Sequence, residues 1–355
     1  MTAEAKLLPD VRKIAVLRAN ALGDFVFTLP ALEALRHAYP EAEIVLLAKA
    51  WHATFLRGRP SQVDRVVVIP LYGGVGAPPE TTGSFAEIEH FFTEMQQERF
   101  DLALQLHGGG RYSNSFVLRL GAKVTAGLKS SEAAPLDRWV PHVHFQHEIL
   151  RYLETVALVG ATPTTLGPRI AVTPEDLAEA TRVVPENDQP LVALHPGAND
   201  IRRRWSPENF AAVGDALAAA GAQVVVTGST EEYDLAEMVV QAMQKRARNL
   251  SGTLSIGGLA GLLSRSRVLI SNDTGPAHLS EAVGTATVGI YWCGNMITFA
   301  PLTRTKQRQV VSWRLNCPVC GRDNISTYCE HEVPFLDDVS VDEVRQAALD
   351  LFALQ

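Results

Sequence analysis

Short apolar runs alternate with amphipathic segments along most of the chain. In the first half, the apolar runs predict strands at 14–17, 44–47, 65–69, 102–106 and 124–127. Between them, apolar positions at helical spacing predict helices at 25–36, 85–98, 112–120 and 147–159. Strands that alternate with helices form parallel sheets with both faces covered, so this half is predicted to be an α/β domain.

A change in composition between residues 160 and 190 marks the predicted domain boundary, because prolines and glycines interrupt the pattern there. A short helix is predicted inside it at 175–183. The alternation then restarts, with strands at 191–194, 223–227, 267–270 and 287–291 and helices at 206–220, 231–246, 256–264 and 340–354. We therefore expect a first domain at 1–165, a second at 186–335 and a final helical segment at 336–355.

Composition narrows the classes of protein to which the chain can belong. Its 355 residues are 46% hydrophobic and 20% charged, which fits a soluble globular protein of two ordinary domains. The net charge of −7 argues against a general nucleic-acid binder. The first residues lack the pattern of a signal peptide, and no apolar run approaches the roughly 20 residues of a spanning helix. A cytoplasmic location is expected, and peripheral contact with the inner membrane face stays open.

The segment from Ser271 to Val283 is the most informative part of the sequence. A buried strand leads into Asn272-Asp273-Thr274-Gly275-Pro276, and a helix containing His278 follows. Pro276 suits a first helical position, and a helix N-terminus with unpaired N–H groups binds phosphate. The alternative is an ordinary helix start capped by Asp273 or Thr274.

Three consecutive arginines, Arg202, Arg203 and Arg204, follow the loop Pro196-Gly197-Ala198. Guanidinium groups match phosphate oxygens with two parallel hydrogen bonds, so the cluster favours a diphosphate ligand. A solvated loop before the next helix is the alternative.

Asp24 ends a Leu-Gly-Asp loop that follows the first predicted strand. A carboxylate at the carboxyl end of a parallel strand can accept a proton from a bound hydroxyl group. The alternative is that Asp24 only caps a helix beginning at Phe25, although Phe27 provides no capping box. The run from His107 to Arg111, with three glycines, ends another strand of this domain, and glycines permit close approach of a ligand to the backbone.

Three of the four cysteines lie close together, as Cys317, Cys320 and Cys329, with His331 nearby. These residue types can close a tetrahedral zinc site, although the spacing is not that of a standard zinc finger. A surface loop with ordinary thiols is the alternative.

Three blocks of sequence resemble glycosyltransferase family 9, which includes the ADP-heptose:lipopolysaccharide heptosyltransferases. They are residues 13–32 with Leu22-Gly23-Asp24, residues 194–210 with His195-Pro196-Gly197, and residues 271–291 with Asn272-Asp273-Thr274-Gly275-Pro276. The resemblance implies a GT-B fold, in which two Rossmann-like domains face each other across a cleft. It further implies acceptor binding by the first domain, nucleotide-sugar binding by the second, and a final helix that packs back on the first.

The resemblance also implies roles for individual residues. Asp24 corresponds to the proposed general base, and the acceptor side is expected to include Gly23, His107 and Arg111. The donor side is expected to include Arg203, Arg204, Glu231, Glu232, Asp273, Thr274, Gly275 and His278. Lysine is usual where this chain has Arg203, which changes the hydrogen-bond geometry. Cysteines recur near 317–329 without a catalytic role, so a metal bound there would be structural.

The leading hypothesis is an inverting glycosyltransferase that moves a sugar, heptose by resemblance, from an ADP-sugar to a lipopolysaccharide core or a related glycan. No cofactor is expected beyond the ADP-sugar substrate, since the chain has no Asp-x-Asp metal motif. Two alternatives stay open: a nucleotide-sugar epimerase of the same architecture, and a non-catalytic module that binds sugar nucleotides or glycans.

Overall fold

The computed structural model describes residues 6–325, 327 and 329–354. The chain divides into two compact units, Met1–Ile170 and Ala171–Gln355, and each is described by itself. The division falls inside the proline-rich segment predicted as the boundary. Residues 1–5, on which the expectation of no signal peptide partly rests, lie outside the described residues.

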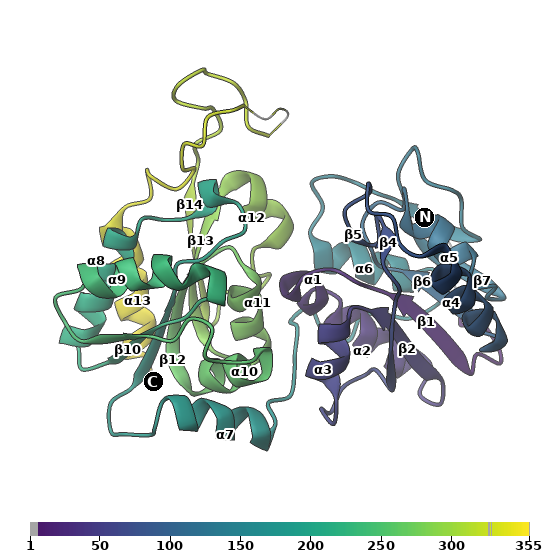
Figure 1. Ribbon diagram of the computed structural model, residues 1–355, viewed down its shortest axis with the longest axis horizontal. Coiled ribbons are helices and arrows are strands. Elements are labelled where there is room, and N and C mark those ends of the chain that lie inside the picture. The colour runs from purple at the N-terminus through teal and green to yellow at the C-terminus, as the bar shows by residue number, and fades with distance from the viewer. Residues whose placement is uncertain (1–5, 326, 328, 355) are drawn as a thin grey trace. The chain divides into compact units, whose positions relative to one another are not determined.

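The first unit is built on a six-stranded parallel sheet (Figure 1). Its strands, in the spatial order of the sheet, are β3 (Arg65–Val68), β2 (Glu43–Ala48), β1 (Lys13–Leu17), β6 (Leu102–Gln105), β7 (Val124–Lys129) and β8 (Arg138–Pro141). The helices are α1 (Leu22–Val26), α2 (Leu29–Ala38), α3 (Ala50–Leu56), α4 (Phe85–Gln97), α5 (Ser113–Leu118) and α6 (Glu148–Ala157), and β4 (Tyr72–Gly73) pairs with β5 (Gly76–Ala77).

The second unit also contains a six-stranded parallel sheet. In spatial order its strands are β11 (Ala247–Asn249), β10 (Gln223–Val226), β9 (Leu191–His195), β12 (Ser266–Asn272), β13 (Ala286–Trp292) and β14 (Gln307–Ser312). The α-helices are α7 (Pro174–Val183), α8 (Pro207–Ala219), α9 (Tyr233–Ala242), α10 (Ile256–Arg265), α11 (Gly275–Ala282), α12 (Cys293–Phe299) and α13 (Val341–Ala353), and short 3-10 turns lie at Ile201–Arg203 and Thr230–Glu232.

The two sheets share one strand order. Numbered along the chain within each unit, the order is 3-2-1-4-5-6, that of a Rossmann fold. In such sheets the connections leave in opposite directions from the two central strands, and ligands bind outside the carboxyl ends of those strands. The switch points are therefore β1 with β6 in the first unit and β9 with β12 in the second.

The central strands are apolar because helices cover both faces of each sheet. Ile14 to Leu17 in β1 and Val192 to Leu194 in β9 are fully buried. Burying a Val, Leu or Ile side chain contributes about 1.5–3 kcal/mol, so each sheet is the centre of its own core. This double burial explains why continuous apolar runs marked the strands so clearly in the sequence.

The structure changes some predicted boundaries. The helix predicted from Phe25 begins three residues earlier and divides into α1 and α2, with Pro30 in the first turn of α2. Several elements had no periodic signal and were not predicted: α3, α12, β4, β5, β8, β11 and β14.

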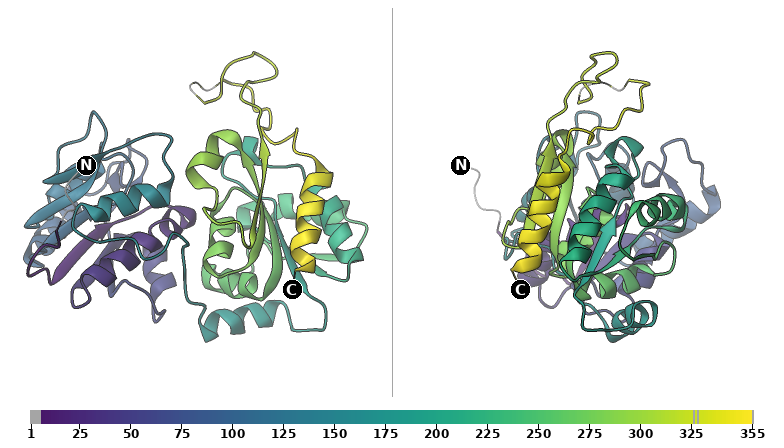
Figure 2. Two further views of the ribbon diagram at one scale, coloured as in Figure 1. Left: turned by 180° about the vertical axis from the view of Figure 1, so that it is seen from behind. Right: turned by 90° about the vertical axis from the view of Figure 1, so that its left-hand side faces the viewer.

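The final helix contributes to the core of the second unit. Helix α13 packs against α8 and strands β12 to β14, so it belongs to the second unit (Figure 2). Its buried residues Val344, Ala348, Leu351 and Phe352 join the core that contains Trp205 and Phe210. The apolar face of the helix is thus used within the second unit, and the expectation that 336–355 packs back on the first domain stays a prediction.

Among the described helices, none has both the length and the apolar character required to cross a bilayer.

Candidate active site

Asp273 is the centre of a polar cluster at the switch point of the second unit. It follows the end of β12 and is 5% exposed. Its Oδ2 accepts from Asn295 Nδ2 at 2.8 Å and lies 3.3 Å from Arg203 Nη1, while its Oδ1 lies 3.2 Å from His278 Nε2. The cluster brings together three of the predicted donor residues, and Asn295 was not predicted.

The environment of Asp273 favours its charged form. Burial alone raises its pKa, but the hydrogen bond and charge of His278, the charge of Arg203 and the hydrogen bond from Asn295 outweigh burial. The pKa of Asp273 therefore lies below its ordinary value. The carboxylate of Asp273 therefore carries a negative charge beside the guanidinium of Arg203, just before the start of helix α11.

Asn272 fastens the loop after β9 to the end of β12. Its Nδ2 donates to the carbonyl of Pro196 at 2.8 Å, and its Oδ1 accepts from the backbone N–H of Trp205 at 3.2 Å. Trp205 is buried and donates from Nε1 to the carbonyl of Val339. The loop that carries Arg203 is thus anchored at both of its ends.

The first turn of α11 is not closed by a side-chain cap in the described structure. Thr274 occupies the N-cap position with an extended backbone, but its side chain makes no capping hydrogen bond. Its Oγ1 contacts Ser271 Oγ at 3.2 Å and the carbonyl of Asn272 at 3.3 Å instead. Thr274 therefore occupies the cap position without a capping side-chain hydrogen bond, and Thr274 and Gly275 remain predicted phosphate contacts.

The three arginines have different surroundings. Arg202 pairs with Asp200 through two hydrogen bonds, at 3.0 Å from Nε and 2.7 Å from Nη2. Arg204 donates from Nε to the carbonyl of Ala198 at 2.9 Å. Among the described contacts, Arg203 is therefore the member of the run that reaches Asp273, while Arg204 as a donor residue stays a prediction.

The two acidic residues predicted on the donor side, Glu231 and Glu232, also have different surroundings. Glu232 accepts from the N–H of Ser229 at 2.8 Å and lies against Gly197, where an added Cβ would fall 2.0 Å from Glu232 Oε1. Glu231 is exposed. Glu232 is thus close to the loop after β9, and contact of either acid with the donor remains a prediction.

Glu281 is a titratable group near this site that sequence reasoning missed. It lies two turns into α11 and is half-buried. Burial raises the pKa of Glu281 to about 7, against the opposing effect of the charge on His278. Perturbed carboxyl groups concentrate at functional sites, although sequence alone does not reveal this burial.

Asp24 lies at the switch point of the first unit and is held there by Arg18. Nη2 of Arg18 is 2.8 Å from Asp24 Oδ1, and Nε donates to the backbone carbonyl of Asp24 at 3.0 Å. The backbone N–H of Ala21 approaches Asp24 Oδ2 at 3.3 Å. Asp24 is therefore a residue of the first turn of α1, and not a cap ahead of Phe25. One third of its side chain remains exposed.

Arg18 is itself part of a buried network. It is 1% exposed and donates from Nη1 to Tyr152 Oη and to the carbonyl of Leu106, both at 2.6 Å. The Tyr152 hydroxyl donates to Glu148, which also pairs with Arg151. Sequence reasoning missed this network. The signal was an arginine directly after a fully apolar strand, where a buried charge requires partners.

The other predicted acceptor residues have mixed surroundings. His107 is buried, and its Nδ1 accepts from the N–H of Ala19 at 3.2 Å, which ties the ends of β1 and β6 together. Burial, with the nearby charges of Arg18 and Lys49, lowers the pKa of His107 to about 3. Arg111 is exposed and pairs with Glu132 at 3.2 Å. Gly23 lies buried within α1, and all three remain predicted acceptor contacts.

Comparison with known proteins agrees with this fold. The model of glycosyltransferase family 9 (heptosyltransferase) matches residues 88–326. Lipopolysaccharide heptosyltransferase 3 of Escherichia coli is 24% identical over 307 residues, covering 78% of this chain and 85% of that protein.

Two solved structures share the two-unit architecture. The family 9 glycosyl transferase from Veillonella parvula DSM 2008 superposes with a TM-score of 0.81 at 22% identity, covering 99% of this chain and all of that chain. E. coli ADP-heptose lps heptosyltransferase II gives a TM-score of 0.74 at 19% identity, covering 96% of this chain and 98% of the other. These likenesses establish the GT-B fold.

The family match covers more than half of the chain, including the cluster around Asp273, although Asp24 precedes it. The family match and the strand order of both sheets together show that the protein is a glycosyltransferase. This protein belongs to glycosyltransferase family 9, the heptosyltransferase family.

Proposed function

We propose that this chain transfers heptose from ADP-heptose to a lipopolysaccharide core or related glycan, with inversion at the anomeric carbon. The proposal is supported by family membership and by the substrates that the relatives' names state. The observation that carries it is the cluster of Arg203, His278 and Asn295 around buried Asp273 at the start of α11.

The Asp273 cluster suits the donor end of the reaction. A helix N-terminus without a side-chain cap offers backbone N–H groups to a diphosphate, and Arg203 adds a nearby positive charge. Asp273 is the natural partner for hydroxyl groups of the transferred sugar, since an ionised carboxylate accepts hydrogen bonds. Negative charge that develops on departing ADP is stabilised by the helix end and Arg203.

Asp24 suits the acceptor end. In a single displacement, the acceptor oxygen bonds to the anomeric carbon as the bond to the ADP oxygen breaks, and the acceptor proton passes to a base. Asp24 supplies that base, because Arg18 fixes one carboxylate oxygen while part of the side chain stays exposed. A single displacement inverts the anomeric centre, and it needs one base and no covalent nucleophile.

The donor is tested by measuring release of nucleoside diphosphate from ADP-heptose, UDP-sugars and GDP-sugars, each with and without a lipopolysaccharide core acceptor. The expected result is acceptor-dependent release from ADP-heptose alone. NMR of the product should show the anomeric configuration opposite to that of the donor.

Two results would count against the proposal. Turnover with a UDP-sugar or GDP-sugar but not with ADP-heptose would remove the donor assignment. Interconversion of free nucleotide-sugars without transfer would instead support an epimerase.

No added divalent cation or other cofactor is proposed for turnover. Contact with the inner membrane face remains a proposal, and co-sedimentation with lipid vesicles tests it.

A further inference from the structure

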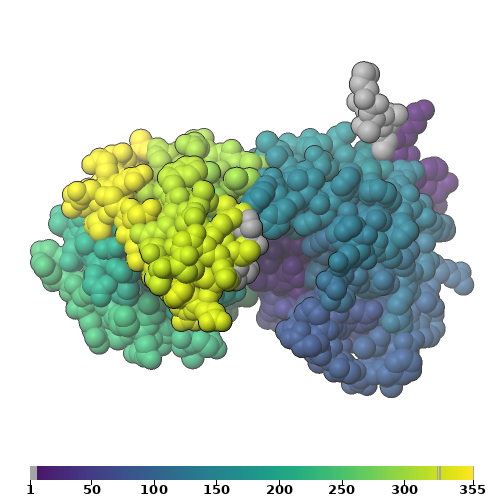
Figure 3. Space-filling model, turned by 90° about the horizontal axis from the view of Figure 1, so that it is seen from above, coloured from purple at the N-terminus to yellow at the C-terminus, as the bar shows by residue number. Residues whose placement is uncertain are grey.

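The segment between β14 and α13 is unusual for its length. Residues 313–340 contain no helix or strand among the described positions, apart from one isolated bridge between Asn316 and Asp323. Figure 1 shows it standing out beyond the end of β14, and in Figure 3 it forms a large part of the visible surface of this unit. Irregular segments longer than about 12–15 residues are uncommon in compact domains and need a reason for their order.

Burial of apolar side chains does not explain the order of the first half of the segment. Trp313 is 68% exposed, Leu315 is 44% exposed and Val319 is 62% exposed. The core contacts begin only at Phe335, Leu336 and Val339. The intervening chain therefore needs another source of stability, as small units without a core commonly do.

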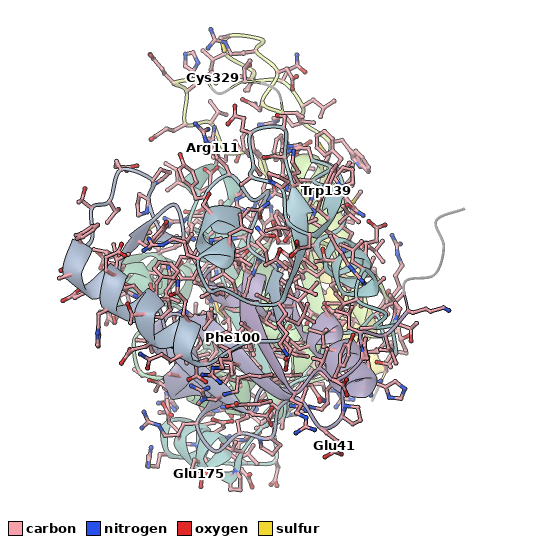
Figure 4. All side chains as sticks on the ribbon, turned by 90° about the vertical axis from the view of Figure 1, so that its right-hand side faces the viewer. Glu41, Phe100, Arg111, Trp139, Glu175 and Cys329 are labelled. Atoms are coloured by element: carbon pink, nitrogen blue, oxygen red, sulfur yellow. The ribbon has the colours of Figure 1, made fainter. Side chains whose placement is uncertain are left out.

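Three cysteines and a histidine come together within this segment. One ligand atom from each of Cys317, Cys320, Cys329 and His331 lies within 4.8 Å of the others. Figure 4 shows the part of the loop that carries Cys329 projecting from the body of the unit. All three cysteines are free thiols. We propose that these four residues bind one structural zinc ion.

The distances fit this ligand set. With Zn–S bonds of about 2.3 Å, two thiolates of a tetrahedral site lie about 3.8 Å apart, so small side-chain adjustments close the observed cluster around an ion. Three thiolates and one imidazole form a Cys₃His site, in which the protein fills all four positions. Such a closed site is typical of structural zinc.

The backbone around the first two cysteines forms a hydrogen-bonded turn. Cys317 donates its N–H to the carbonyl of Arg322 at 2.9 Å, and Gly321 donates to the carbonyl of Cys317 at 2.8 Å. Gly321 has a φ of +72°, which a residue with a side chain rarely adopts. The N–H of Cys320 also hydrogen-bonds to the Cys317 sulfur. The turn keeps the two sulfurs within the cluster of four ligand atoms.

The zinc site would fasten the outer end of the segment, while its inner end is fastened by other contacts. Phe335 donates its N–H to the carbonyl of Arg202 at 2.6 Å, and the Arg202 guanidinium lies 4.9 Å from the centre of the Phe335 ring. The metal therefore has a structural role apart from the Asp273 cluster, and the proposal does not depend on the substrate of the enzyme.

The test measures metal bound to the full-length chain. The protein is expressed with zinc and iron both present, separated by gel filtration in metal-free buffer, and analysed by mass spectrometry for metal per chain. The wild-type chain is expected to carry about one zinc ion. Cys320→Ser and His331→Gln are expected to lose most of it. Cys293→Ala and His90→Gln are the matched controls, because they remove a cysteine and a histidine outside the cluster and should retain the zinc.

A second measurement does not depend on the folding of variants. Zinc is stripped from the wild-type chain and Co²⁺ is added, with the visible spectrum recorded. Thiolate-to-cobalt charge-transfer and tetrahedral d–d bands are expected, and limited proteolysis within 313–340 should slow when metal is restored. A wild-type chain without zinc, a chain with iron in its place, or a disulfide between Cys317 and Cys320 in the native protein would each overturn the proposal.

Discussion

Arg18 contacts Asp24 twice, through Nη2 to the side chain at 2.8 Å and through Nε to the backbone carbonyl at 3.0 Å. The carboxylate is held by Arg18 at Oδ1 and by the backbone N–H of Ala21 at Oδ2, at 3.3 Å, which fixes its orientation. Proton transfer by a general base depends on such positioning. Arg18 is a positioning residue and Asp24 the proposed base. The two roles predict different effects of substitution.

Substitution Asp24→Asn keeps the shape of the side chain and removes the proton acceptor. We expect kcat to fall about 10²- to 10⁴-fold, while ADP affinity by calorimetry and the thermal unfolding midpoint stay near wild type. Asp188→Asn, at an exposed loop position, is the control and should leave kcat unchanged. Transfer by Asp24→Asn at nearly the wild-type rate would remove Asp24 as the base.

Substitution Arg18→Met should lower both stability and activity. It leaves Tyr152 and Glu148 without their buried cationic partner, and breaking a buried pair costs about 3–5 kcal/mol. We expect the lower end, about 3 kcal/mol, because Arg151 still pairs with Glu148. Denaturant unfolding measures the free energy. Arg18→Lys keeps the positive charge but loses the planar set of N–H donors of the guanidinium. Its stability and its kcat should therefore lie between those of the wild type and those of Arg18→Met. An unchanged kcat in both variants would separate Arg18 from catalysis.

Substitution Arg203→Ala should weaken donor binding. A hydrogen bond to a charged group contributes about 1.5–3 kcal/mol, so ADP affinity should fall roughly 10- to 100-fold, with little loss of folding stability. Arg248→Ala, on the edge strand β11, is the control. Hydrogen exchange adds an independent measurement: ADP should protect the backbone amides of Thr274 and Gly275. Protection confined to the first unit would place the donor elsewhere.

Two buried histidines predict how stability depends on pH. Burial is the main cause that lowers the pKa of His52 and of His107 to about 3, below the value of about 6.5 in an unfolded chain. The folded state therefore binds fewer protons than the unfolded state between these values. The contribution of these two neutral histidines to the free energy of unfolding is fully present above about pH 6.5. Below that pH, each histidine lowers the free energy of unfolding by about 1.4 kcal/mol per pH unit.

Denaturant unfolding between pH 7 and pH 4 measures this slope. In His52→Leu, the change in the free energy of unfolding per pH unit should be smaller by about 1.4 kcal/mol, the contribution of one histidine. In His90→Gln, an exposed control, it should equal that of the wild type. An equal slope in wild type and His52→Leu would show that His52 titrates normally in the folded protein.

The inner strands of both sheets could be predicted because each has a local signal, whereas β8, β11 and β14 could not. Strands buried on both faces are apolar runs. Asp273 follows such a run directly, and Asp24 and Arg203 lie in the segments that follow β1 and β9. The partners could not be predicted, since Arg18 and Tyr152 are 134 residues apart in the chain. The packing of α13 in the core of the second unit could not be predicted for a related reason. The sequence of an amphipathic helix shows that it needs an apolar surface but not which one.

The position of α13 has a consequence for how this enzyme can be taken apart and recombined. Because the last helix completes the second unit, each half is one uninterrupted stretch of chain, and a single peptide connection near Ile170 joins them. Each stretch contains its own sheet and its own core. A half exchanged between relatives is therefore expected to fold as one piece, and under the proposed function such an exchange changes the choice of one substrate only.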